Sequence, residues 1–149
     1  MTGYLVDTNI ISAGAPTAAV KHANLIGWME SHSSKLFLSA VTIAEIADGV
    51  AKTRRQGAKR KADELSAWLR AVLHLYGDRV LPFESATAEI AGALSDLARS
   101  RGHSPGFADI IIAASARQHG LTILSRNARH FAPMNATVID PFERLPPDK

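Results

Sequence analysis

The chain has 149 residues, of which 46% are hydrophobic. This suffices for one hydrophobic core but leaves no room for two domains of typical size. Cysteine is absent, which excludes disulfides, thiolate metal sites and cysteine nucleophiles. The apolar runs are shorter than the roughly 18 residues of a membrane-spanning helix, and no basic residue precedes Lys21, so no signal peptide is predicted. We therefore expect a single cytoplasmic domain over residues 1–149, with no membrane partner and a core at about 4–141.

Positive charge is concentrated in one segment. The net charge at pH 7 is +3, and six of the 17 Lys and Arg residues lie between Val50 and Ala62, where there is no acidic residue. Without these six, eleven cations face 14 acidic residues, so the rest of the chain is net negative. Such a patch suits a polyanion such as RNA or an acidic protein segment. A solvated helical hairpin around Gly57 is an equally open alternative. The six residues are Lys52, Arg54, Arg55, Lys59, Arg60 and Lys61.

Helices and strands are predicted to alternate along the chain. Short apolar runs that end at polar or turn-forming residues predict strands, and apolar residues at helical spacing predict helices. Ser104 is the expected N-cap of one helix, with Pro105 as its first residue. The expected order is strand 4–6, helix 17–31, strand 36–38, helix from 39 towards the basic segment, helix 58–76, strand 79–81, helix 85–101, helix 104–118, strand 121–124, a single turn 127–131, strand 137–139 and an irregular tail 141–149.

This alternation predicts a three-layer α/β/α fold around a short-stranded, mainly parallel central sheet. Strands separated by helices pair in parallel through right-handed crossovers, which place helices on both faces of the sheet. Ligands of such folds bind beyond the carboxyl ends of the strands. Polar residues directly after strands are therefore candidates for a site: Asp7, Ser39 and the segment 125–127.

Three acidic residues are expected at this edge of the sheet. Asp7 follows the first strand, Glu45 lies in the helix after the second, and Asp109 lies in the first turn of the helix before the fourth. Carboxylates that gather within a few ångströms repel each other unless a cation neutralises them. Mg²⁺ prefers a few carboxylates together with waters and substrate phosphate oxygens, and it activates water for attack on phosphorus. The three acids therefore predict a metal-dependent phosphodiesterase.

Each acid also has a purely structural interpretation. Asp7 could form an Asx turn with Asn9 or cap the next helix. Thr42 and Glu45 have the spacing of a capping box. Asp109 could stabilise a helix N-terminus through the helix dipole. The functional interpretation is favoured because all three acids fall at the same edge of the predicted sheet.

Four segments together resemble the successive motifs of the PIN domain family, in its VapC-like and FitB-like branch of toxins from type II toxin–antitoxin pairs. The order of the segments, their spacing and the total length agree, so the resemblance covers Tyr4 to about Pro141. The four segments are LVDTN at 5–9, LSAVTIAEI at 38–46, ADIIIAA at 108–114 and TILSRN at 122–127.

The resemblance implies a Mg²⁺- or Mn²⁺-dependent endoribonuclease that is kept silent by a cognate antitoxin. Asp7, Glu45 and Asp109 match the acidic metal site of the family. The fourth position of the family is often Asp, whereas this chain has Asn127, which we expect to act in catalysis through its amide oxygen without adding charge. Thr8, Ser39 and Ser125 are further candidates for hydrogen bonds to the ligands or to phosphate, and they are equally credible as turn or cap residues.

Two other functions stay open at this point. A non-catalytic, PIN-like RNA-binding or scaffold module is the main alternative, and Asn127 would then be a first sign of lost activity. A phosphatase of the haloacid dehalogenase type would carry a second Asp two residues after Asp7, where this chain has Asn9. A homodimer is also expected, from the resemblance and because four large apolar residues are more than we expect one small core to cover. These residues are Trp28, Trp68, Leu69 and Leu73.

Overall fold

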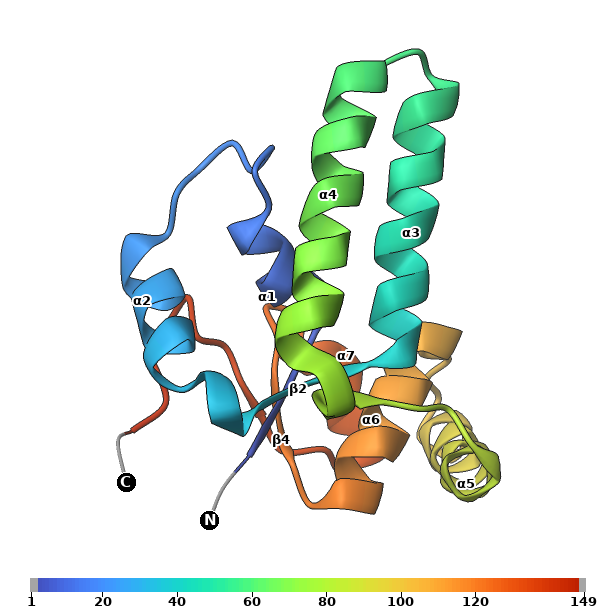
Figure 1. Cartoon of the computed structure of the whole chain (residues 1–149). Helices are drawn as coiled ribbons and strands as arrows, with labels where there is room; N and C mark the ends of the chain where they lie inside the picture. The colour runs from blue at the N-terminus through green and yellow to red at the C-terminus, as the bar shows by residue number, and fades with distance from the viewer. Residues whose placement is uncertain (1–2, 148–149) are drawn as a thin grey trace.

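The computed structural model describes residues 3–147, and its centre is a five-stranded parallel sheet (Figure 1). The strands are ordered β3-β2-β1-β4-β5, and every neighbouring pair is parallel. This confirms the predicted mainly parallel α/β fold. The strands are β1 (Tyr4–Val6), β2 (Leu36–Ser39), β3 (Val80–Leu81), β4 (Thr122–Leu124) and β5 (Val138–Ile139).

Helices cover both faces of the sheet. In Figure 1 the long helices α3 and α4 run side by side away from the sheet, and α5 lies beside α6 at the other side of the molecule. The α-helices are α1 (Thr8–Ile11), α2 (Ala23–Ser31), α3 (Ala40–Arg55), α4 (Lys59–Tyr76), α5 (Ser85–Ser100), α6 (Phe107–His119) and α7 (Ala128–Phe131). Single 3₁₀ turns lie at Ser12–Gly14, Ser33–Lys35, Gly77–Arg79 and Ala132–Met134.

Strand alternation divides the core into two clusters. Side chains of a strand point to opposite faces in turn. Tyr4 and Val6 accordingly pack with residues of α2 and α4, whereas Leu5 packs with α5 and α6. The second cluster also contains Phe131 of α7, which is fully buried. The core therefore fixes α7 next to the end of β4, where the candidate residues Ser125 and Asn127 lie.

The first long helix begins later than predicted. The expected helix 17–31 is observed as α2, Ala23–Ser31, while residues 15–18 form a turn closed by a bond from the Ala18 N–H to the Ala15 carbonyl. Val20 had suggested an apolar helix face, but it is 61% exposed. The prediction was wrong here because apolar spacing makes a helix only where a core is present to bury that face.

The helix that carries Asp109 also begins later than predicted. It starts at Phe107 with Gly106 as N-cap, so Ser104 and Pro105 precede it in an irregular segment. Gly106 has extended backbone angles, and its carbonyl accepts the first helical bond from Ile110. Glycine is a poor helix former, which places the boundary at Gly106 and not before it. Asp109 still falls in the first turn, as predicted.

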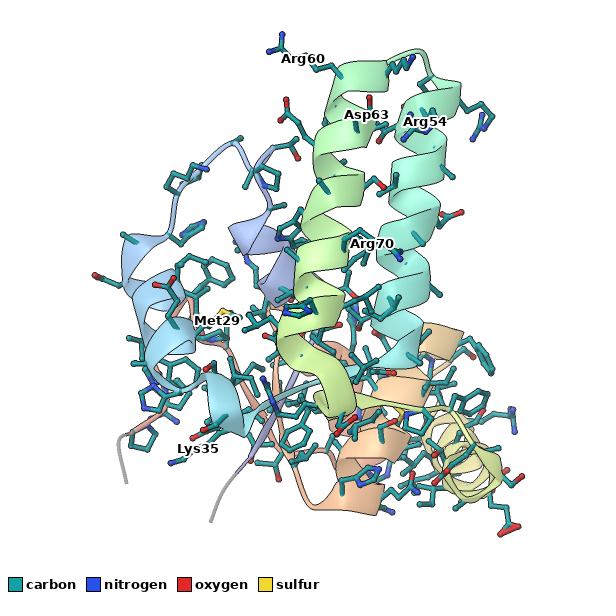
Figure 2. The ribbon with its side chains drawn as sticks, viewed as in Figure 1. Met29, Lys35, Arg54, Arg60, Asp63 and Arg70 are labelled. Atoms are coloured by element: carbon teal, nitrogen blue, oxygen red, sulfur yellow. The ribbon has the colours of Figure 1, made fainter. Side chains whose placement is uncertain are left out.

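The basic segment forms the turn of the α3–α4 hairpin. Gly57 adopts a φ of 88°, in the region that favours glycine, where the two helices meet. All six cations are exposed, and Arg54 forms an ion pair of 2.8 Å with Asp63 (Figure 2). Figure 2 also places Arg60 at the far end of this hairpin from the sheet. The predicted helical hairpin is confirmed, and the interpretation as a polyanion-binding patch stays a prediction.

The residues that suggested a homodimer all pack at the core of the chain. Trp28 and Leu69 are buried, and Trp68 and Leu73 pack against the same core cluster while partly exposed. Packing within the chain thus accounts for Trp28 and Leu69, whereas Trp68 and Leu73 keep some exposed surface, and the homodimer stays a prediction. The tail is irregular over 141–147, and the rest of the predicted tail lies outside the described residues. None of the helices over 3–147 is both long and apolar enough to span a membrane.

Candidate active site

Asp7 lies at the carboxyl end of the central strand β1. Its own backbone N–H donates to the Leu124 carbonyl of β4 at 2.9 Å, which fixes the residue at the sheet edge. The carboxylate accepts bonds from the Ser125 hydroxyl at 2.6 Å and the Thr8 backbone N–H at 2.8 Å. A longer contact of 3.4 Å comes from the Asn9 side-chain amide. Asp7 is buried and caps α1, so the structural interpretation of this residue is also correct.

Burial and nearby charge act against ionisation of this carboxyl. Burial raises the pKa of Asp7, bonds from Ser125 and Thr8 lower it, and the negative charge of Asp109 raises it again. Asp109 is similarly affected: burial raises its pKa, His130 lowers it, and the charge of Glu45 raises it. Asp109 is thus near enough to Asp7 for its charge to act on that carboxyl, and Glu45 is near enough to Asp109 to do the same.

Glu45 lies in α3 and points back towards α1. Its carboxylate accepts a 2.6 Å bond from the Thr8 hydroxyl, and the same hydroxyl contacts the Thr42 hydroxyl at 3.2 Å. The N-cap of α3 is Ser39, whose hydroxyl accepts a bond from the Val41 N–H at 3.1 Å. Thr42 and Glu45 therefore do not form a capping box, and Glu45 joins the site through Thr8.

Asp109 meets a residue that sequence reasoning missed. The Nδ1 atom of His130 in α7 lies 3.3 Å from Oδ2 of Asp109, and the two side chains are 45% and 23% exposed. A ring N–H at Nδ1 can donate to this carboxylate oxygen. The available signal was the single turn predicted at 127–131, which carries this side chain past the end of the fourth strand. His130 therefore contributes an imidazole to the candidate site, in contact with Asp109.

Asn127 enters the site through its backbone. Its N–H donates to the Ser125 hydroxyl at 3.0 Å, and this hydroxyl in turn donates to Asp7. The Asn127 side chain is exposed and makes no capping bond at the start of α7. Asn127 thus supports the hydroxyl that binds Asp7, and its proposed amide contribution to catalysis stays a prediction.

The sequence motifs implied short parallel strands with three acids at the carboxyl edge of the sheet. The structure has the strand order β3-β2-β1-β4-β5 and places the acids at that edge. The model of the PIN domain family matches residues 4–134. The chain belongs to the PIN domain family. The chain is 32% identical over 139 residues to toxin FitB of Neisseria gonorrhoeae, with 93% of this chain and 97% of FitB covered. It is also 31% identical over 143 residues to the VapC ribonuclease Y4jK of Sinorhizobium fredii, with 93% and 97% covered.

A solved structure agrees with this PIN domain over nearly its whole length. The crystal structure of FitAcB from Neisseria gonorrhoeae superposes with a TM-score of 0.82 at 32% identity. The superposition covers 93% of this chain and 98% of the other. The two chains therefore share the same fold over most of their length.

The acids of this PIN domain offer the right donor chemistry for a hard divalent cation. Carboxylate oxygens are the ligands that Mg²⁺ and Mn²⁺ prefer. Over residues 3–147, however, no group of three or more acidic or histidine side chains stands in a metal-binding arrangement. Instead Asp7 is bonded to Ser125, Glu45 to Thr8 and Asp109 to His130. The donor chemistry fits such an ion, and the three carboxylates would have to turn from these partners towards it.

The Ser125 hydroxyl is expected to stabilise the PIN domain through its bond to Asp7. Ser125→Ala removes a 2.6 Å bond to a buried carboxylate and should lower the free energy of unfolding by about 1–3 kcal/mol. Urea denaturation measures the change. Ser100→Ala is the matched control, because the bond of Ser100 to the Leu97 carbonyl is exposed and its loss should cost less than about 0.5 kcal/mol. Equal effects of both substitutions would contradict the expected role.

Proposed function

We propose that this PIN domain is a divalent-metal-dependent endoribonuclease and the toxin of a type II toxin–antitoxin pair. The observation that carries the proposal is that Asp7, Glu45 and Asp109 come from three separate elements to the carboxyl edge of the sheet, where Ser125, Thr8 and His130 contact them. Its whole-length likeness to a protein named VapC ribonuclease and to one named toxin FitB supports this assignment.

Asp7, Glu45 and Asp109 would hold the cation, with Mg²⁺ or Mn²⁺ as the proposed ions. A bound divalent ion of this kind polarises a phosphate and lowers the pKa of a coordinated water, which favours hydrolysis of the phosphodiester. The protein contributes the placement of its ligands. Ser125 and the Thr8 N–H orient Asp7, the Thr8 hydroxyl orients Glu45 and His130 orients Asp109.

Proximity of like charges supports a cation at this site. A buried carboxylate surrounded by other carboxylates is costly unless an opposite charge compensates it. In the described structure His130 is the basic side chain in contact with the group: it lies 3.3 Å from Asp109, and it also lowers the pKa of Asp7. A non-catalytic scaffold would have no need for three such groups at one edge, which favours the nuclease over the scaffold.

The proposed partners are an RNA substrate, a cognate antitoxin and a second copy of the chain. RNA follows from the proposed chemistry, and the antitoxin from the likeness to toxin FitB. The α3–α4 hairpin, with its six exposed cations, is a candidate surface for an acidic antitoxin segment or for RNA phosphates.

Metal removal tests the proposed function directly. The purified protein should cut total cellular RNA or a tRNA pool in the presence of Mg²⁺ or Mn²⁺. EDTA should lower the rate at least about 100-fold, because a bound cation contributes several kcal/mol to the stabilisation of the charge that develops in the transition state. Added Mn²⁺ should restore cleavage. Asn127→Asp, which adds a carboxylate, should lower the Mn²⁺ concentration needed for half of the maximal rate.

Two outcomes would reject the proposal. Cleavage that EDTA leaves unchanged would assign the activity to a contaminant or to another mechanism. A correctly folded protein, checked by circular dichroism, that cuts no RNA at any metal concentration would favour the scaffold.

A further inference from the structure

An open cavity of about 400 Å³ lies directly beside the candidate metal ligands. It is bounded by the segment before α6 and by α7, and Asp109 and His130 form part of its wall. His103, Ser104 and Arg129 also line it. Cavities of this size hold small ligands such as part of a nucleotide. The cavity and the acidic site therefore share a wall, at Asp109.

The polar groups of this cavity are available to a ligand. Within residues 3–147 the side chains of His103, Ser104 and Arg129 form no hydrogen bond or ion pair, and all three are exposed. The neighbouring arginines are engaged elsewhere. The Arg126 guanidinium lies 4.4 Å from the centre of the Phe142 ring, and Arg101 donates to the Asn135 side chain at 2.8 Å and to a backbone carbonyl. Arg129 is therefore the cation that faces this cavity.

Charge balance indicates what such a cation would bind. One divalent ion would offset two of the three negative charges of Asp7, Glu45 and Asp109. The site would then stay net negative and repel the backbone of RNA, which carries one negative charge per phosphate. A guanidinium next to the site compensates this repulsion and matches phosphate oxygens with paired N–H donors.

We propose that this cavity binds an RNA backbone phosphate next to the one that is cleaved, with Arg129 as its cation and His103 and Ser104 as further donors. The inference rests on the proposed nuclease function and adds a binding subsite to it. The hydroxyl of Ser104 and a ring N–H of His103 can each donate to a phosphate oxygen. Asp109 and His130, which contact each other at 3.3 Å, form the wall that this subsite shares with the carboxylates.

The salt dependence of RNA binding tests the subsite. The Asp7→Asn variant, which should not cleave RNA under the proposed function, would be titrated with a fluorescently labelled single-stranded RNA oligonucleotide at several salt concentrations. Adding Arg129→Ala should weaken binding about 5- to 10-fold at low salt and reduce the slope of log K against log salt by about 0.7, the value for one phosphate contact in a single strand. Arg129→Lys should keep most of the slope, because it keeps the charge.

Two further substitutions make the result specific. Arg117→Ala is the matched control, because it also removes one exposed arginine charge, but at the end of α6 that is far from Asp109 and the cavity. It should leave the slope unchanged. Arg60→Ala tests the α3–α4 hairpin as the competing RNA surface. In wild-type protein, Arg129→Ala should raise the KM for RNA cleavage more than it lowers kcat, as expected for a binding residue.

The inference and the proposed function fail in different ways. Metal-dependent cleavage together with an unchanged slope for Arg129→Ala would overturn the subsite alone, as would an equal loss for Arg117→Ala. A slope lost only in Arg60→Ala would place the RNA on the hairpin and also overturn the subsite. Absence of both RNA binding and cleavage in the folded protein would overturn the nuclease function and the subsite with it.

Discussion

Asp109→Asn should lower the rate of RNA cleavage at least about 100-fold while the protein stays folded. The substitution keeps the shape of the side chain but removes one negative charge and one strong ligand of the proposed cation. Asp109 is only 23% exposed, so water would not readily replace its carboxylate. Calorimetry should show that Mn²⁺ affinity falls at least about tenfold, which corresponds to roughly 1.4 kcal/mol.

The matched control for this substitution is Asp96→Asn in α5. Its carboxylate is 82% exposed and forms only a 3.5 Å ion pair with Arg99, so cleavage and Mn²⁺ affinity should equal those of wild type. Circular dichroism and urea denaturation would confirm that both variants are folded. If Asp109→Asn cut RNA at the wild-type rate, Asp109 would not belong to the catalytic site.

Phe131→Ala should be among the most destabilising single substitutions in this protein. The ring is fully buried in the core cluster that also contains Leu5 and Ile123, and its removal should cost about 3–5 kcal/mol through lost burial and the cavity left behind. Urea denaturation with an unchanged slope would report this as a lower midpoint. Leu75→Ala removes an apolar side chain that is 60% exposed and should change stability by less than about 0.5 kcal/mol.

This experiment also tests the position of α7. Phe131 is the buried residue of α7 and anchors this single turn to the core. The positions of the neighbouring Asn127, Arg129 and His130 therefore depend on it. A cost below about 1 kcal/mol would show that α7 is not docked as described. The contact between His130 and Asp109 would then need another explanation.

Local patterns in the sequence predicted most of the fold. Five apolar runs became five parallel strands, and the edge of the sheet that holds Asp7 and Asp109 follows from the rule that parallel strands end at one edge. Helix starts were less reliable. Residues before Ala23 and before Phe107 had the sequence pattern of a helix, but in the structure the two helices begin only at Ala23 and at Phe107.

The identities of the acidic residues and their shared edge of the sheet could be determined from the sequence, since each depends on short-range periodicity and strand order. Their hydrogen-bond partners could not be. Thr8 and Glu45 are 37 residues apart, and Asp7 and Ser125 are 118 apart. No sequence motif pointed to His130, which only the fold places beside Asp109. Such contacts depend on side-chain directions that only the packing of the complete core decides, because no local preference selects one distant partner over another.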